Sequence, residues 1–174
     1  MIFIVIHMKL KRRHYLNEKV VQRVLGKFFN DLKIDPADLL DSGVEAAYYE
    51  SNVEVFLIEK TVAFVKRGDD LFPILLYEPL LKVLQSVIVD MGAVYHICNG
   101  ADVMAPGIVC IDGNFDKGSN VVIRDEKNGK PLAIVRTLYA SSDMSKIKKG
   151  EVAENLHYVG DEIWELAKKI SANA

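Results

Sequence analysis

Short runs of apolar and β-branched residues, each ended by a turn signal, constrain the fold of this chain more than any other feature. Three of them follow one another closely, at Val44–Tyr49, Val53–Ile58 and Thr61–Lys66. The polar pairs Ser51-Asn52 and Glu59-Lys60 separate them. Runs of this length with turn residues between them are typical of strands joined by tight turns. We therefore predict a β-meander in the first half of the chain.

Helices are expected on either side of this meander. Asn17 can cap a helix that runs to about Lys33, because Val20, Val24 and Phe28 recur on one face of it. These elements give the first half an α+β character.

Two further short helices are expected, each with a proline in its first turn. They cover Ala37–Asp41 and the segment from Pro79 to about Gln85. Together with the meander they form a first α+β domain of residues 1–86. Within it, residues 1–7 are a possible extension, because Met8 is an alternative start of translation.

The stretch from Asp90 to Ile108 combines a helical turn with two separated glycines. Apolar residues at helical spacing run into Gly100, and Pro106-Gly107 precede Ile108–Ile111, which is predicted as a buried strand. Glycine permits a positive φ or the close approach of a partner to bare backbone. The stretch carries no His-Asp pair at useful spacing, no phosphate-loop Lys-Ser element and no paired cysteine ligands, so it predicts no catalytic site.

The remaining chain, within a second domain of residues 87–174, is predicted as another set of short strands. Asn128-Gly129 indicates a hairpin between Val121–Arg124 and Leu132–Arg136. Three elements complete it: a short capped helix from Ser141 to Lys149-Gly150, a last strand at His157–Val159, and a helix capped by Asp161 that runs through Ile170. Many short strands with few helices are typical of a small closed or nearly closed barrel.

The composition excludes several classes of protein. The chain has 174 residues, of which 50% are hydrophobic, so it can bury a substantial core. Its formal net charge of -2 gives no overall attraction to nucleic acid, and any RNA binding requires a local basic patch. The apolar run Met1–Ile6 is too short to cross a membrane. Cys98 and Cys110 lack the partner residues of a zinc site, so no metal or cofactor is expected. Both are predicted as buried free thiols, which fits a reducing cytoplasm.

The Asp90–Ile108 stretch resembles the RNA-contacting helix and loop of the PUA domain, which is named for pseudouridine synthases and archaeosine transglycosylases. Lys149-Gly150-Glu151 and Glu154–Trp164 resemble the closing segment of the malignant T-cell amplified sequence family, in its archaeal type. The resemblance covers nearly the whole chain from about Met8. It implies an α+β fold in which a small pre-PUA domain is followed by a PUA pseudo-barrel of short strands with flanking helices.

The resemblance implies RNA contacts at one loop and two basic clusters. The loop would approach RNA through Gly100, Ala101, Asp102, Val103, Met104, Ala105, Pro106 and Gly107. The clusters, Lys11, Arg12 and Arg13, and Lys146, Lys148 and Lys149, would contact phosphate. Without the resemblance, the loop is interpreted as an ordinary helix stop followed by a proline turn, and the clusters as solvated charges.

Within the loop, Asp102 and the glycines have separate expected roles. A carboxylate repels phosphate, so Asp102 is expected to hold loop amides, contact a base amino group or cap the turn. A branched residue at Gly100 or Gly107 is expected to impair RNA binding far more than stability, because its Cβ would keep the RNA at a distance.

Other chemistry-bearing residues have structural interpretations. Arg124 and Arg136 are expected to pair across strands with Asp125 or Glu126. His157 lacks a nucleophile or a fixed carboxylate partner that the sequence can place, so it is predicted as a packed barrel residue rather than an acid or base.

The resemblance therefore predicts a non-catalytic RNA-binding protein that acts on tRNA or the small ribosomal subunit in translation initiation or recycling, with a translation factor as a further partner. Two alternatives stay open. The chain could be an accessory subunit that delivers tRNA or rRNA to a modifying enzyme, or a protein–protein scaffold without RNA contact.

Overall fold

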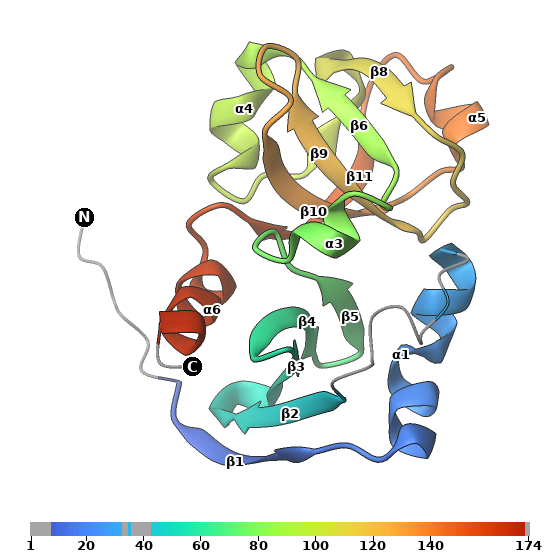
Figure 1. The fold of residues 1–174 in the computed structure, drawn as a ribbon. Helices are drawn as coiled ribbons and strands as arrows, with labels where there is room; N and C mark the ends of the chain where they lie inside the picture. The colour runs from blue at the N-terminus through green and yellow to red at the C-terminus, as the bar shows by residue number, and fades with distance from the viewer. Residues whose placement is uncertain (1–7, 33–34, 36–42, 173–174) are drawn as a thin grey trace. The chain divides into compact units, whose positions relative to one another are not determined.

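The computed structural model describes residues 8–32, 35 and 43–172, so the expected helix at Ala37–Asp41 and residues 1–7 lie outside the described part. The chain divides into two compact units. One comprises residues 1–71 and 165–174, and the other comprises residues 72–164. Figure 1 shows the elements of both units along the chain.

The first unit is built on a sheet with the strand order β1-β2-β3-β4-β5. The strands are β1 (Leu10–Tyr15), β2 (Val44–Tyr49), β3 (Val53–Ile58), β4 (Thr61–Arg67) and β5 (Asp70–Pro73), with the short 3₁₀ helix η1 (Glu50–Asn52) between β2 and β3. Strands β1 to β4 each pair antiparallel with the next strand in sequence, and helix α1 lies between β1 and β2 along the chain. The predicted β-meander is confirmed.

Helix α1 (Glu18–Leu32) packs on this sheet. Its first turn is capped by Asn17, whose Oδ1 accepts a hydrogen bond of 3.0 Å from the Val20 N–H, as predicted. Phe28 meets Phe64 of β4 edge to face, with ring centroids 4.9 Å apart. The buried apolar side chains described for α1 are Val21, Leu25, Phe28 and Phe29, so the face that packs in the core includes Phe28 but leaves Val20 and Val24 only partly buried.

The second unit holds a six-stranded sheet with the order β7-β11-β10-β9-β6-β8. Its elements are α3 (Glu78–Leu81), β6 (Ser86–Val89), α4 (Met91–Ile97), β7 (Val103–Met104), the 3₁₀ helix η2 (Ala105–Gly107), β8 (Ile108–Asp112), β9 (Asn120–Asp125), β10 (Pro131–Thr137), α5 (Ser141–Met144) and β11 (Glu151–Tyr158); α6 (Glu162–Ala172) begins in this unit. β6 runs parallel to β9, and the other pairs are antiparallel. The strands curl around a shared core without closing, which is a pseudo-barrel (Figure 1).

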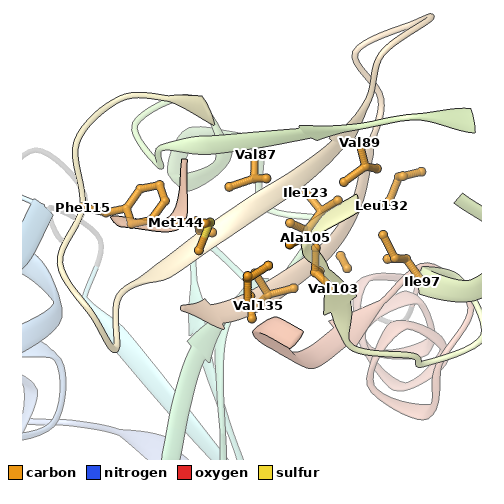
Figure 2. Close-up of a cluster of buried hydrophobic side chains, with 14 residues drawn as sticks. Val87, Val89, Ile97, Val103, Ala105, Phe115, Ile123, Leu132, Val135 and Met144 are labelled. Atoms are coloured by element: carbon orange, nitrogen blue, oxygen red, sulfur yellow. The ribbon is translucent and has the colours of Figure 1, made fainter. Parts of the chain in front are cut away.

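Side chains from nearly every strand meet inside this pseudo-barrel. Figure 2 shows Val87 of β6, Ile123 of β9 and Val135 of β10 in one cluster of buried apolar side chains, with Phe115 at one end of it. Each of these three valine and isoleucine side chains is almost fully buried. Burial of apolar side chains is the largest favourable contribution to the free energy of folding.

Four predicted elements differ from the observed ones. The last strand, predicted at His157–Val159, is longer and begins earlier, as β11 from Glu151 to Tyr158. Helix α3 ends at Leu81 rather than near Gln85, because the following residues enter β6 and pair with β9. Helix α5 ends at Met144, and its N-cap is Ala140 without a side-chain bond, so the predicted Ser141 cap is wrong. β8 is an edge strand paired only with β6, and its Val109 and Cys110 are exposed, so the prediction of a buried strand is wrong.

The predicted hairpin between β9 and β10 is confirmed, and Asp125 organises its turn. The carboxylate of Asp125 accepts hydrogen bonds from the N–H groups of Asn128 at 2.6 Å, Lys130 at 2.9 Å and Lys127 at 3.0 Å. These bonds, the one from Asn128 first, hold the pKa of Asp125 below its ordinary value. The charged carboxylate thus stabilises the folded state.

Asp125→Asn is expected to make the melting temperature less dependent on pH. Because the folded pKa of Asp125 is depressed, its contribution is present above the unfolded pKa of about 4 and is lost as the pH falls through the folded pKa. The difference in melting temperature between the wild type and the variant should therefore be larger at pH 7 than at pH 2. Melting curves followed by circular dichroism at both pH values measure it, and a constant difference would contradict the assignment.

Candidate nucleic-acid interface

The loop predicted to contact RNA begins where α4 ends. Asp90 caps the start of α4 by accepting a hydrogen bond of 2.8 Å from the Ala93 N–H. After the helix, Gly100 adopts a φ of 87°, and the N–H of Ala101 returns to the His96 carbonyl. Gly100 therefore supplies a backbone conformation that other residues rarely adopt.

A side chain from a distant strand fixes this loop. Asn155 of β11 donates from Nδ2 to the carbonyl oxygens of Ile97 at 3.1 Å and Ala101 at 3.0 Å. Its own backbone N–H donates to Asp102 Oδ1 at 2.8 Å. Asp102 thus accepts a hydrogen bond from a backbone amide of β11, whereas the sequence suggested an amide of the loop itself.

The rest of the loop alternates between the core and the surface. Figure 2 shows Val103 and Ala105 among the core side chains, and both are buried. This burial leaves only the backbone of these two residues accessible to the RNA that the sequence predicts at the loop. Met104 and Pro106 are exposed.

Gly107 lies against the first turn of α4. Its carbonyl accepts a hydrogen bond of 2.9 Å from the Asp90 N–H, and a Cβ placed on it would lie 3.0 Å from the Ala93 Cβ. Gly107 has no positive φ. Its glycine is thus required by close packing against the helix.

The second basic cluster adjoins this loop. The N–H of Ala105 donates to the Gly150 carbonyl at 2.9 Å, and Met104 pairs with Glu151 of β11. Lys148 and Lys149 directly precede Gly150 and are exposed. Among the described residues, neither lysine forms an ion pair, whereas Lys146 pairs with Asp143 at 3.1 Å. The structure therefore brings two uncompensated cations next to the loop.

The first basic cluster lies on β1, in the other unit. Arg13 donates to Glu45 at 2.6 Å, and this hydrogen bond lowers the pKa of the Glu45 carboxyl. The guanidinium of Arg12 lies 4.0 Å from the centre of the Tyr48 ring. Lys11 is exposed. Arg12 and Arg13 thus already have partners within their own sheet.

The structure corrects the expected partners of the other arginines. Arg124 donates to Ser86 Oγ at 3.2 Å, the Gly129 carbonyl at 3.0 Å and the Leu81 carbonyl at 3.1 Å. Arg136 pairs with Glu154 at 2.6 Å. Both guanidinium groups are therefore used to join segments that are remote in sequence, rather than pairing with Asp125 or Glu126.

His157 is buried, as predicted, but has a partner that the sequence did not indicate. Its Nδ1 lies 2.8 Å from Asp161 Oδ2, while Asp161 Oδ1 accepts a hydrogen bond of 2.7 Å from the Trp164 N–H. The predicted Asp161 cap of α6 is thereby confirmed. One carboxylate serves both the histidine and the helix.

The cysteines differ from their predicted state in one respect. Cys110 is exposed on β8, whereas Cys98 is partly buried, which raises the pKa of its thiol. Across residues 8–32, 35 and 43–172, no group of three His, Cys, Asp or Glu side chains is arranged to hold a metal ion. The same residues include no helix long and apolar enough to span a membrane.

Comparison with known proteins identifies this architecture. The profile of the PUA domain matches residues 85–159. An uncharacterized protein of Methanocaldococcus jannaschii is 36% identical over 163 residues, which cover 90% of this chain and 98% of the relative. The chain belongs to the PUA-domain proteins.

Further relatives of this PUA-domain protein include one whose name refers to translation and one of the malignant T-cell-amplified sequence family. Translation machinery-associated protein 20 of Saccharomyces cerevisiae is 28% identical over 130 residues, covering 71% of this chain and 72% of the relative. Malignant T-cell-amplified sequence 1-A of Xenopus laevis is 27% identical over 120 residues, covering 66% of each chain. The resemblance found in the sequence is therefore confirmed.

A solved structure supports the fold of the whole PUA-domain protein. The crystal structure of a hypothetical protein from Pyrococcus horikoshii matches with a TM-score of 0.77 and 32% identity. The match covers 90% of this chain and 99% of the other. The α+β fold with a PUA pseudo-barrel is confirmed.

Proposed function

We propose that this protein is a non-catalytic RNA-binding protein of translation, with tRNA or the rRNA of the small ribosomal subunit as its ligand. In this proposal the pre-PUA domain spans residues 1–86 and the PUA domain spans residues 87–174. The RNA lies on the loop from Gly100 to Gly107 and reaches Lys148 and Lys149. The protein acts in the cytoplasm, where its RNA targets are found.

One observation carries the proposal most directly. The backbone bond between Ala105 and Gly150 places Lys148 and Lys149 beside the loop, and neither lysine is neutralised by an acid among the described residues. A chain with a net charge of -2 needs such a local patch in order to attract phosphate. The names of the translation-associated relatives support the same setting.

RNA cross-linking in cells, followed by sequencing, tests the biological role. Small-subunit rRNA or tRNA bound outside a modification complex is the expected result. A tRNA class recovered only together with a modifying enzyme would favour the accessory-subunit alternative. Recovery of no RNA above background would favour the scaffold alternative and contradict the proposal.

Replacing both lysines, as Lys148→Ala with Lys149→Ala, is expected to weaken RNA binding uniformly across sequences. Each phosphate contact contributes about 0.7 to 0.9 to the slope of log affinity against log salt concentration. The double variant should therefore lower this slope by about 1.5. Titrations at several salt concentrations measure it.

Lys146→Ala is the matched control for this experiment. Lys146 belongs to the same cluster but is already paired with Asp143. Lys146→Ala should lower the slope of log affinity against log salt concentration by less than replacement of either Lys148 or Lys149. A slope unchanged in the double variant, with RNA still bound, would remove Lys148 and Lys149 from the interface.

A further inference from the structure

Strand β1 is the outermost strand of the first sheet and carries the first basic cluster. Among the described residues it pairs only with β2, and Figure 1 shows it beside that strand at the edge of the sheet. All six of its residues, Leu10–Tyr15, are exposed to solvent. Successive side chains of a strand point to opposite faces of a sheet. β1 is therefore open on both faces as well as along one edge.

The free edge of β1 presents backbone groups in a defined order. The N–H of Leu16 donates to the carbonyl of Val44 at 2.8 Å. Hydrogen-bonded and non-bonded pairs alternate along an antiparallel ladder, so Arg13 and Tyr15 direct their own backbone groups away from β2. No described residue takes up these outward N–H and carbonyl groups. They are available to a further strand.

The side chains beside this edge are basic on both faces of the sheet. Arg12 lies on the face of Tyr48, with its guanidinium 4.0 Å from the centre of that ring. Arg13 lies on the opposite face and donates to Glu45 at 2.6 Å. A guanidinium has five N–H donors, so Arg13 can pair with a second carboxylate while it is bound to Glu45. Among the described residues, Lys11 and Arg12 form no ion pair.

These charges exclude a second copy of the same strand as the partner. Two β1 strands paired antiparallel about their midpoint would place Arg12 opposite Arg13. Like charges directly opposite one another destabilise a sheet, and a charged edge also discourages the addition of neutral strands. An acidic strand meets the reverse situation, because its carboxylates come to lie beside cations.

A peptide matches this edge better than RNA does. Phosphate oxygens only accept hydrogen bonds, so a row of phosphates leaves the outward carbonyls of Arg13 and Tyr15 without a donor. A row of phosphates also follows one face of the strand, whereas the basic side chains lie on both. An added peptide strand supplies donors as well as acceptors and places alternate side chains on the two faces.

We propose that the free edge of β1 binds an extended acidic segment of a partner protein, which adds to the sheet as a further strand. The backbone of that segment pairs with Arg13 and Tyr15, and its carboxylates pair with Lys11, Arg12 and Arg13. The inference goes beyond the proposed function, because it uses none of the residues through which that function holds RNA. It gives a peptide partner to the three basic residues for which the sequence suggested phosphate.

Titration of the full-length chain with a blocked ten-residue peptide rich in glutamate, valine and threonine tests the proposal. Lys11→Glu combined with Arg12→Glu should weaken binding of this peptide by about tenfold or more, because like charges then face one another. Arg23→Glu combined with Lys27→Glu makes the same change of charge at exposed positions of α1. It should leave the affinity within about twofold of the wild type, because salt screens charges that do not touch the peptide.

Two measurements on the wild-type chain separate strand addition from a contact through side chains alone. On saturation with the peptide, the amides of Arg13 and Tyr15 should exchange hydrogen about tenfold more slowly or less, because they become hydrogen-bonded. The amides of Arg12 and His14 already face β2 and should change far less. A control peptide with N-methyl groups on two adjacent central residues cannot complete a ladder along either edge, so it should bind about tenfold more weakly.

Three results would overturn the proposal. The first is equal binding of the methylated and unmethylated peptides with Arg13 and Tyr15 unprotected, which would show a purely ionic contact. The second is no binding of the acidic peptide to the wild type. The third is loss of affinity for an adenosine-rich oligoribonucleotide, but not for the peptide, in the variant with Lys11 and Arg12 replaced, which would assign this edge to RNA.

Discussion

Replacing Gly100 with alanine is expected to lower the melting temperature by about 10 °C. The φ of 87° at this position costs a residue with a Cβ about 1 to 2 kcal/mol. The new Cβ would also lie 2.9 Å from Cε1 of Tyr158, so the ring or the loop must shift. A total cost of about 2 kcal/mol lowers the melting temperature by about 10 °C if the second unit, residues 72–164, unfolds on its own.

Gly118→Ala separates the two causes. Gly118 has a φ of 86°, but a Cβ at this position would have no other atom within 4 Å, so its replacement carries the conformational cost alone. It should lower the melting temperature by clearly less than Gly100→Ala. Equal effects would show that the Tyr158 contact contributes nothing. The sequence suggested that a change at Gly100 would impair RNA binding far more than stability, and the structure leads us to expect a large loss of stability.

Asn155→Asp is expected to destabilise the protein by about 3 kcal/mol at neutral pH. The substitution keeps the shape of the side chain but turns a donor to two carbonyl oxygens, those of Ile97 and Ala101, into a charged acceptor. The partly buried Ile97 carbonyl left without its donor costs about 1 to 3 kcal/mol, the exposed Ala101 carbonyl costs less, and the charge adds repulsion. RNA affinity should fall as well, because the loop loses its two side-chain hydrogen bonds from β11.

The pH dependence of this variant is diagnostic. Repulsion from two carbonyls raises the pKa of the introduced carboxyl, and once protonated it can donate to one of them. The loss of stability relative to the wild type should therefore shrink as the pH falls from 7 to 4, as measured by urea denaturation. Asn155→Ala, which introduces no charge, should show a smaller loss that does not change with pH.

The sequence predicted the elements whose signals are local. Asn17 and Asp161 lie next to the helices they cap, and the Asn128-Gly129 turn lies between the two strands it joins. Such signals depend on the backbone within a few residues of the side chain. They are therefore visible in a single sequence without knowledge of the fold.

The errors arose where tertiary pairing decided the outcome. Helix α3 stops early because the chain is needed for β6, and β8 is exposed because it lies at the edge of the sheet. In the loop predicted to contact RNA, the strand pairing of β7 with β11 turns the side chains of Val103 and Ala105 into the core, which the sequence did not indicate. No local pattern carries this information.

Asn155 is the residue of the site that sequence reasoning missed. It stands in the middle of a strand and matches no motif of its own, and its partners are 53 to 58 residues earlier in the chain. No pattern in the sequence indicates these contacts. They became visible only when the register of β11 was known.

This separation along the chain affects the order in which the protein can become functional during synthesis. A nascent chain that ends at β8 already contains every residue of the loop, but it lacks the side chain that holds the loop in shape. The loop can settle only after β11 has left the ribosome and joined the sheet. An emerging chain therefore completes this loop only after β11 has been made, about 50 residues after the loop itself.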